Sequence, residues 1–539
     1  MRNDQHQPDE EILDEELIEE REVGEDPDSL KRAAPAWIIS AVVHAVVLFL
    51  MSLIVYAAHE EVEEPAIKTT AIPPPPKREE PKMERELKTS DTPLDVPTTS
   101  DVDKPSPVSE LDVPVEEFSR EEENESEVPK GREEAIADSE MGGTGGFMAI
   151  GAGGGGSGMF GSRTGGGKKR ALGKFGGSKG GESAVDAALR WFKKHQSANG
   201  QWDVDGYPVN CTDPGAKCEP GTENANEQGD VACTGYALLC FLGAGYDHRM
   251  PSKYKPTVKK GLDWLMSVQK PDGTFGERNY ENAVATMAMA EAYAMSNDPA
   301  LKGPAQKGID IVLARQTKDK AGGYGLGWDY NAPNPGRMDS SVTGWNVMAL
   351  KSAAAGGLNI GNGMEGSKQW LKEAWKASNK DFKAKDPYTD TSTFPYTWSV
   401  DGAVDVGAPG ADGKDMACVG ALCAVFLGHQ ANDEMLNSLA NYVMKHQMPT
   451  SYPCNTYYMY YNTLAIFQVA GARWEKWNAT VRDMLVKAQR KSTDCFDGSW
   501  DYTGTKFHGH ATGRLLSTAY CCLSLEVYYR YLPIAGQKN

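Results

Sequence analysis

Single aspartates stand at the start of three helix-forming segments in the C-terminal part of the chain. They are Asp230 in DVACT, Asp339 in DSSVT and Asp415 in DMACV. An aspartate in the first turn of a helix commonly caps backbone N–H groups, and the helix dipole favours its negative charge. Burial would raise the pKa of such a carboxyl and let it act as a general acid. We therefore treat these residues as candidate catalytic acids, with helix capping as the competing interpretation.

Aromatic side chains in helix-forming segments provide a second candidate site. Rings that face a cavity could hold a cationic intermediate, line a pocket for a polyprenyl chain or a peptide, or simply fill the core. The long acid-rich loop around residues 386–412 could cover the mouth of such a cavity, and its other interpretation is a solvated loop. The candidate cavity residues are Tyr236, Trp345, Tyr457, Tyr458 and Tyr461, with Trp398 from this loop.

All ten cysteines lie beyond residue 182. Cys211 and Cys218 flank the short segment CTDPGAKC and form the first candidate disulfide; Cys454 and Cys495 form a second. Spacing alone does not fix the connectivity. The cysteines within helices rich in small residues are interpreted as packed small hydrophobes. From the sequence we predict no metal site and no cofactor.

Residues 37–58 read WIISAVVHAVVLFLMSLIVYAA and carry no formal charge. A helix of this length spans a hydrocarbon core of about 30 Å. Lys31 and Arg32 precede the segment and glutamates follow it, so the positive-inside rule places the N-terminus in the cytoplasm. The sequence therefore predicts a single-pass protein of the cytoplasmic membrane, with residues 59–539 in the periplasm or an equivalent extracytoplasmic space.

Two polar residues, Ser40 and His44, interrupt this apolar segment and share one helix face because they are four positions apart. An ionisable side chain inside a membrane suggests a function, although His44 could simply hydrogen-bond a neighbour. The pattern SAVVH, followed by the proline-rich stretch at 73–76, resembles the membrane anchor of TonB-type energy transducers. That resemblance implies a proton-driven motor of the ExbB–ExbD type as a partner. The receptor-binding domain of that family is replaced here by a different domain.

Charge and composition divide the rest of the chain. The tail 1–36 has a net charge of −9, the linker 59–140 has −15, and the Gly-rich linker 141–181 has +6 with 19 glycines. The Pro- and Glu-rich linker 59–140 has too few apolar residues to offset its ordering entropy, so we expect it to be disordered. Residues 182–539 hold the core and carry a net charge of only −1. Without a basic face, the protein is not expected to bind nucleic acid.

Beyond residue 182 the chain consists of six repeated units. Each unit has an amphipathic helix, a turn with glycine and an aromatic residue, and a second helix of smaller residues. Apolar side chains recur at helical spacing, as at Val185, Ala188, Leu189 and Phe192. Such units stack because none can bury its apolar face alone, and small residues let the second helices crowd together. We therefore predict an all-α fold, an (α/α)6 toroid of six helix hairpins, with an open solenoid as the alternative.

The turns between the helices carry a repeated motif. Its form is Gln-x-x-x-Gly-x-aromatic, in which Gln bonds the backbone of the next turn, Gly takes a left-handed step and the aromatic ring packs back. These turns resemble those of squalene–hopene cyclases and protein prenyltransferase β subunits, whose repeats form α/α toroids. The two full copies are Gln196, Gly200 and Trp202, and Gln269, Gly273 and Phe275.

The resemblance implies a central apolar cavity that accepts isoprenoid chains or lipids. The Asp-x-Asp-Asp acid of the cyclases is missing, however, and so is the zinc motif of the prenyltransferases. We therefore expect a membrane-anchored toroid that binds a hydrophobic ligand or a protein partner without standard cyclisation. The alternatives are a divergent terpenoid-cyclase-like enzyme and a TonB-like energy transducer.

Overall fold

The computed structural model describes residues 160–221, 227–320, 323, 325–407, 415–430, 432–502 and 513–531. The predicted membrane segment with Ser40 and His44, the linker 59–140 and the tail 1–36 lie outside these residues. No helix among the residues described is both long enough and apolar enough to cross a membrane.

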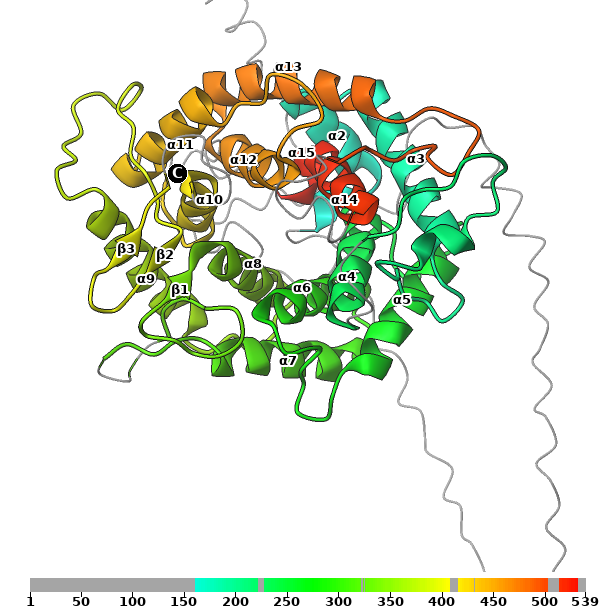
Figure 1. The fold of residues 1–539 in the computed structure, drawn as a ribbon, viewed down its shortest axis with the longest axis horizontal. Helices are drawn as coiled ribbons and strands as arrows, with labels where there is room; N and C mark the ends of the chain where they lie inside the picture. Colours follow the sequence, from blue (N-terminus) through cyan, green and yellow to red (C-terminus); the bar gives the residue numbers. More distant parts are fainter. Residues whose placement is uncertain are drawn as a thin grey trace, which may run out of the picture. The chain divides into compact units, whose positions relative to one another are not determined.

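In the described part of the chain, twelve helices alternate between an outer and an inner layer (Figure 1). The outer helices are α3 (Lys179–His195), α5 (Lys255–Val268), α7 (Pro299–Ala314), α9 (Gly363–Ser378), α11 (Glu434–His446) and α13 (Gly471–Ala488). The inner helices are α4 (Glu227–Gly243), α6 (Asn279–Ser296), α8 (Ser340–Ala355), α10 (Ala417–Phe426), α12 (Thr456–Val469) and α14 (Gly513–Leu525).

Smaller elements decorate this ring. Two of them, η3 (Gly161–Arg163) and α2 (Gly165–Phe175), precede α3, and α15 (Val527–Arg530) follows α14. The loops hold η4 (Tyr207–Asn210) and a three-stranded antiparallel sheet of β1 (Met338–Asp339), β2 (Thr397–Trp398) and β3 (Val404–Asp405).

The inner helices form a closed circle. Each packs against the next in the order α4, α6, α8, α10, α12 and α14, and α14 packs back against α4. An open solenoid would leave its first and last inner helices without this contact. The predicted all-α toroid of six helix hairpins is therefore confirmed, and the solenoid alternative is wrong.

The two layers differ in burial, as their sequences predict. On α3, Val185, Ala188, Leu189 and Phe192 are buried, whereas the other face carries exposed lysines and arginine. The inner helix α8 is buried on nearly all sides. Its Gly344 meets α10 and α12 so closely that a Cβ there would lie 2.8 Å from a methyl of Val419. Small residues thus set the spacing of the inner circle.

The motif glutamines connect neighbouring outer helices. The side-chain amide of Gln196 donates to the carbonyls of Gly200 and of Thr257 on α5, at 2.8 and 2.9 Å. Gln269 bonds Gly273 and Pro304 on α7 in the same way. Gly200 and Gly273 both take left-handed conformations, with φ of 104° and 102°. The ring of Trp202 packs back and donates to the carbonyl of Phe192.

A looser copy of the motif, in which DGSW at 497–500 follows Gln489, closes the ring. The amide of Gln489, which caps α13, donates to Gly498 in its own turn and to Ala184 on α3, at 2.9 and 2.7 Å. The same bond that joins consecutive hairpins therefore also joins the sixth hairpin to the first.

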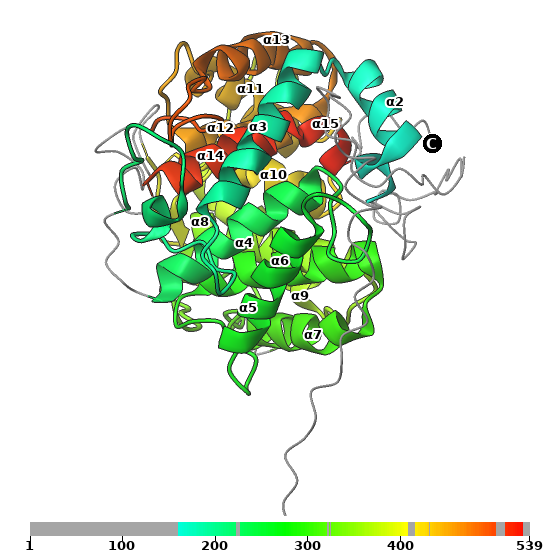
Figure 2. The same ribbon diagram turned by 90° about the vertical axis from the view of Figure 1, so that its right-hand side faces the viewer.

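The folded region begins earlier than the sequence predicts. The interval 141–181 was expected to be a flexible Gly-rich linker, yet η3, α2 and the start of α3 lie within it. Arg163 and Lys168 explain the difference, since both are buried and bind acids of the ring, at Glu291 and Glu182. Figure 2 shows α2 beside α15, at the end of the ring opposite the loop that follows α3.

Candidate functional site

The long loops of the toroid gather at one end. Because outer and inner helices alternate in direction, every connection from an outer helix to the following inner helix opens at the same end, here called the loop face. These connections include residues 196–221, 315–339 and 379–407, and they contain η4 and the three-stranded sheet. The three candidate aspartates lie at this end, at or near the starts of α4, α8 and α10.

Aromatic rings from opposite sides of the inner circle meet in its centre. Trp345 of α8 stacks on Tyr460 of α12 at 5.8 Å and on Tyr520 of α14 at 6.4 Å between ring centroids. Tyr236 of α4 touches both Trp345 and Tyr520 in edge-to-face geometry. Since α8 and α14 lie across the circle from each other, side chains occupy the gap seen between the ribbons in Figure 1.

The remaining aromatic candidates fall into two groups. Tyr457 and Tyr461 belong to this aromatic centre, where Tyr461 touches Trp345 and Tyr457 touches Tyr520. Tyr458 instead accepts a bond from the backbone N–H of Asp415, and Trp398 lies in strand β2 at the loop face.

Tyr460 lies on the same inner helix as Tyr457 and Tyr461 and belongs to the same group of candidate rings. Tyr520 was missed as a site residue, although it occupies an inner helix rich in small residues.

Several polar atoms of the aromatic centre are buried without a partner. Among the residues described, none forms a hydrogen bond to Nε1 of Trp345 or to the hydroxyls of Tyr460 and Tyr461. Burial raises the pKa of both phenols far above the ordinary value, so they remain protonated donors. Buried donors of this kind bind ordered water or a small polar group.

Asp339 is a buried helix cap. Its Oδ1 accepts from the N–H groups of Ser341 and Val342 and from the Ser341 hydroxyl, and its Oδ2 accepts from Arg337 at 2.8 Å. Burial raises the pKa of Asp339, although Ser341 and Arg337 oppose the shift. The carboxylate is therefore committed to its helix and to one arginine, as the capping interpretation predicts.

The other two candidate acids also have local partners. Asp230 accepts from the backbone N–H of Val204 at 2.8 Å, which ties the first loop to α4. Asp415 is buried just before α10, and its Oδ1 accepts from the backbone N–H of Ala417 at 3.5 Å. Each acid is thus engaged with its own loop or helix start.

Arginine and tyrosine form a polar aromatic patch on the loop face. The guanidinium of Arg337 lies over the rings of Tyr330 and Tyr396, 5.1 and 5.7 Å from their centroids. The two hydroxyls are 2.9 Å apart, and Arg337 also binds Asp329. Because the patch is fixed in place, little side-chain entropy would be lost on binding there.

The large apolar side chains that are exposed, among the residues described, all lie in the connections of the loop face. Val209 and Tyr388 are 83% and 79% exposed, and Tyr330 and Val406 are 37% exposed. Exposed aromatic residues next to arginine are the composition that dominates binding energy at protein interfaces.

All ten cysteines, including Cys211 and Cys218 of the candidate disulfide, are free thiols in the structure. The Cys218 thiol points instead to the Cys495 carbonyl, at 3.1 Å. Cys495 is likewise not bonded to Cys454. Loop closure across the ring, which spacing does not reveal, decides these neighbours.

No protein-family model and no curated protein matches the sequence. Among solved structures, the α-1,6-mannanase GH76A from Salegentibacter sp. HEL1_6 is similar, with 13% identity, a TM-score of 0.42, and 65% of this chain and 98% of that chain covered. The type II terpene cyclase MstE from Scytonema is similar with 12% identity, a TM-score of 0.39, and coverage of 65% and 98%. An unsaturated glucuronyl hydrolase specific for heparin is similar with 15% identity, a TM-score of 0.43, and coverage of 66% and 97%.

Proposed function

We propose that this protein is a membrane-tethered binding protein, whose toroid captures a partner protein at the loop face and does not perform standard cyclisation. The observation that carries the proposal is the contact between Trp345 and Tyr520 across the inner circle. A cyclase of the resembled family would hold its substrate in that place.

The chemistry of the aspartates supports the same proposal. The carboxylate of Asp339 caps α8 through one oxygen and pairs with Arg337 through the other. A general acid must donate a proton to a substrate, and burial does raise the pKa of Asp339. Both of its carboxylate oxygens, however, already accept bonds from Ser341, Val342 and Arg337. Capping therefore accounts for the residue without any catalytic role.

The exposed residues of the loop face suggest where a partner binds. Val209, Tyr330 and Tyr388 lie on three different connections of this face. A partner that covered them would bury both aliphatic and aromatic surface around the Arg337 patch. The tether is inferred from residues 37–58, and the resemblance of Ser40 and His44 to TonB-type transducers suggests that a motor pulls on it.

Site-specific crosslinking of the full chain in its native membrane tests this function. A photoreactive residue at position 209 or 388 should capture the same partner, whereas one at Lys259, on the outer wall of α5, should not. Equal capture at Lys259, or capture at neither loop position, would contradict the proposed surface. If His44→Ala leaves the protein fully functional in cells, the motor is not needed.

A divergent terpenoid-cyclase-like enzyme is the second candidate. The electron-rich rings of the aromatic centre, with their buried unpartnered donors, favour it. Native mass spectrometry of the full chain distinguishes the two: a co-purified isoprenoid, converted by wild type but not by Asp339→Asn, would establish the enzyme and remove the binding proposal.

A further inference from the structure

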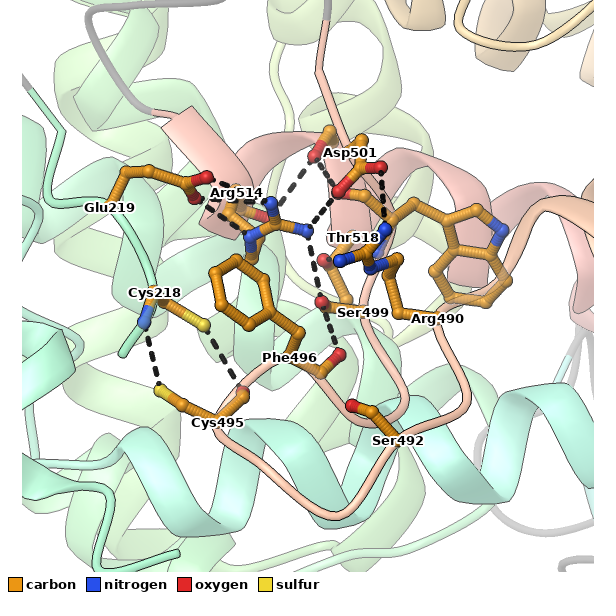
Figure 3. Close-up of polar contacts among 12 residues, drawn as sticks. Cys218, Glu219, Arg490, Ser492, Cys495, Phe496, Ser499, Asp501, Arg514 and Thr518 are labelled. Atoms are coloured by element: carbon orange, nitrogen blue, oxygen red, sulfur yellow. Dashed lines mark hydrogen bonds and ion pairs between the residues drawn. The ribbon is translucent and has the colours of Figure 1, made fainter. Parts of the chain in front are cut away.

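Three potential metal ligands converge where the first and last hairpins of the toroid meet. The ligand atoms of His195, Cys218 and Cys495 all lie within 4.8 Å of one another, and all three residues are buried. His195 ends α3, Cys218 lies in the loop that follows α3, and Cys495 lies in the loop that follows α13. Figure 3 shows the thiols of Cys218 and Cys495 on facing loops.

The imidazole of His195 is oriented as in a metal site. Its Nδ1 lies 2.7 Å from the carbonyl oxygen of Trp191, which can only accept, so Nδ1 carries the proton. The lone pair of Nε2 then points to Sγ of Cys495, at 3.1 Å. Metal-binding histidines usually donate their other N–H to a carbonyl or carboxylate in this way.

The surroundings of the cysteine sulfurs also suit metal binding. Sγ of Cys495 accepts from the backbone N–H of Cys218 at 3.1 Å, a contact that would stabilise a thiolate. Cys211 is also buried, and it lies close enough to Cys495 for their thiols to interact. The ligand atoms of His195, Cys218 and Cys495 therefore gather around one point, with the sulfur of Cys211 beside this group.

We propose that His195, Cys218 and Cys495, with Cys211 as the fourth ligand, bind one structural zinc ion at this seam. Cys3His is a common donor set of closed tetrahedral zinc sites, and soft thiolates with imidazole suit this metal. At ordinary bond lengths the ligand atoms would stand roughly 3.6–3.8 Å apart. The ligand atoms of His195, Cys218 and Cys495 therefore need to move by only about 1 Å to reach these positions. Binding would convert three thiols into thiolates and release three protons.

A disulfide would use this arrangement less completely. It would oxidise two thiols and leave the third buried. If Cys495 took part, the lone pair of Nε2 of His195 would face a disulfide sulfur that has no proton to donate. Zinc engages all four donors at once. The proposed ion lies in the outer wall, between α3 and the loop before α14, and not in the aromatic centre.

The position of the site explains what the ion would do. His195 and Cys495 are 300 residues apart in the sequence, and they belong to the first and the last hairpin of the toroid. Constraining so long a loop removes much entropy from the unfolded chain. Beside the cluster, Arg514 of α14 joins Glu219 and Asp501 at 3.0 and 2.8 Å (Figure 3), so the seam is held by charge as well.

Metal analysis of the full chain, purified in detergent under reducing conditions, tests the proposal. We expect about one zinc per chain, lost in Cys218→Ser and Cys495→Ser but retained in the matched control Cys454→Ser. Since a variant could fail to fold, the wild-type chain provides a second measurement. After chelation, cobalt should bind stoichiometrically with the absorption of thiolate-to-cobalt charge transfer, and zinc should displace it.

Three results would overturn the zinc site. The first is a reduced wild-type chain that binds neither zinc nor cobalt stoichiometrically. The second is a disulfide between any two of Cys211, Cys218 and Cys495 in protein isolated from its native membrane. The third is a cobalt spectrum without thiolate character, which would place the metal elsewhere.

Discussion

Glu291 is the buried anion that attaches the N-terminal segment to the toroid. Its carboxylate lies 2.7 Å from Arg163 of η3 and 3.3 Å from Arg530 of α15, and all three side chains are fully buried. The hydroxyls of Ser352 and Tyr531 complete its shell, at 3.1 and 3.3 Å. Burial opposes ionisation of Glu291, but the two arginines outweigh burial and lower its pKa.

Two substitutions should separate the roles of the anion and of its cations. Glu291→Gln leaves two buried guanidinium groups without this anion, and stranding a buried charge costs about 3–5 kcal/mol. Arg163→Met leaves Glu291 paired with Arg530 but also frees the Leu242 carbonyl, which Arg163 contacts at 3.3 Å. Loss of one charged hydrogen bond costs about 1.5–3 kcal/mol, so Arg163→Met should destabilise the protein less than Glu291→Gln.

Chemical denaturation of the purified chain measures both free energies of unfolding. The double variant should lose at least about 1 kcal/mol less than the sum of the single losses, because the two residues share one network. Lys259→Met is the matched control, since its ion pair with Asp263 is solvent-exposed and contributes at most about 1 kcal/mol. Losses from Arg163→Met no larger than this control, or additive single losses, would refute the argument that the pair anchors η3 and α2.

Three further predictions have defined outcomes. Burial raises the pKa of Glu526 from 4.5 to about 8, so folding stability should fall as the pH rises from about 4.5 to 8. Glu526→Gln should remove this slope, which a pH series of melting curves would detect; an unchanged slope would exclude Glu526 as its source. Trp345→Ala should lower the free energy of unfolding by about 3–5 kcal/mol, because it opens a cavity in the aromatic centre. Tyr388→Ala, at an exposed position, should lower it by under about 0.5 kcal/mol. Similar losses for the two variants in chemical denaturation would mean that the centre is loosely packed. Asp339→Ala should cost about 2 kcal/mol and Asp339→Asn clearly less, because Asn also caps helices; equal losses would show that the bond to Arg337 dominates.

The repeated pattern of the sequence was sufficient to predict the ring. The spacing of Val185, Ala188, Leu189 and Phe192 gives an outer helix, and the small residues around Gly344 give an inner one. Both signals are local, and a local signal repeated six times determines how the hairpins stack. Closure followed from the same motif, since Gln489 repeats on α3 what Gln196 does on α5.

Contacts between distant segments were not predictable in the same way. The glycines around Arg163 look like a flexible tether in the sequence. Composition does not show that Glu291 is buried in the toroid and that Arg163 pairs with it. Likewise, aromatic residues on α8 and α14 indicate a lined cavity or a filled core equally well. Only the diameter of the inner circle decides that Trp345 and Tyr520 touch.

The seam of the toroid shows why the sequence suggested a disulfide where we propose a metal site. Along the chain, Cys211 and Cys218 are near neighbours, and proximity in sequence made them a pair. In the closed ring, the loop after α13 brings Cys495 and the backbone of residue 218 together, and α3 presents His195 to both. Each hairpin in the middle of the chain has two sequential neighbours, but the first and the last meet only by folding. The proposed metal ligands at this junction would therefore stabilise the contact between the first and last hairpins, which is the one contact between neighbouring hairpins that chain connectivity does not enforce.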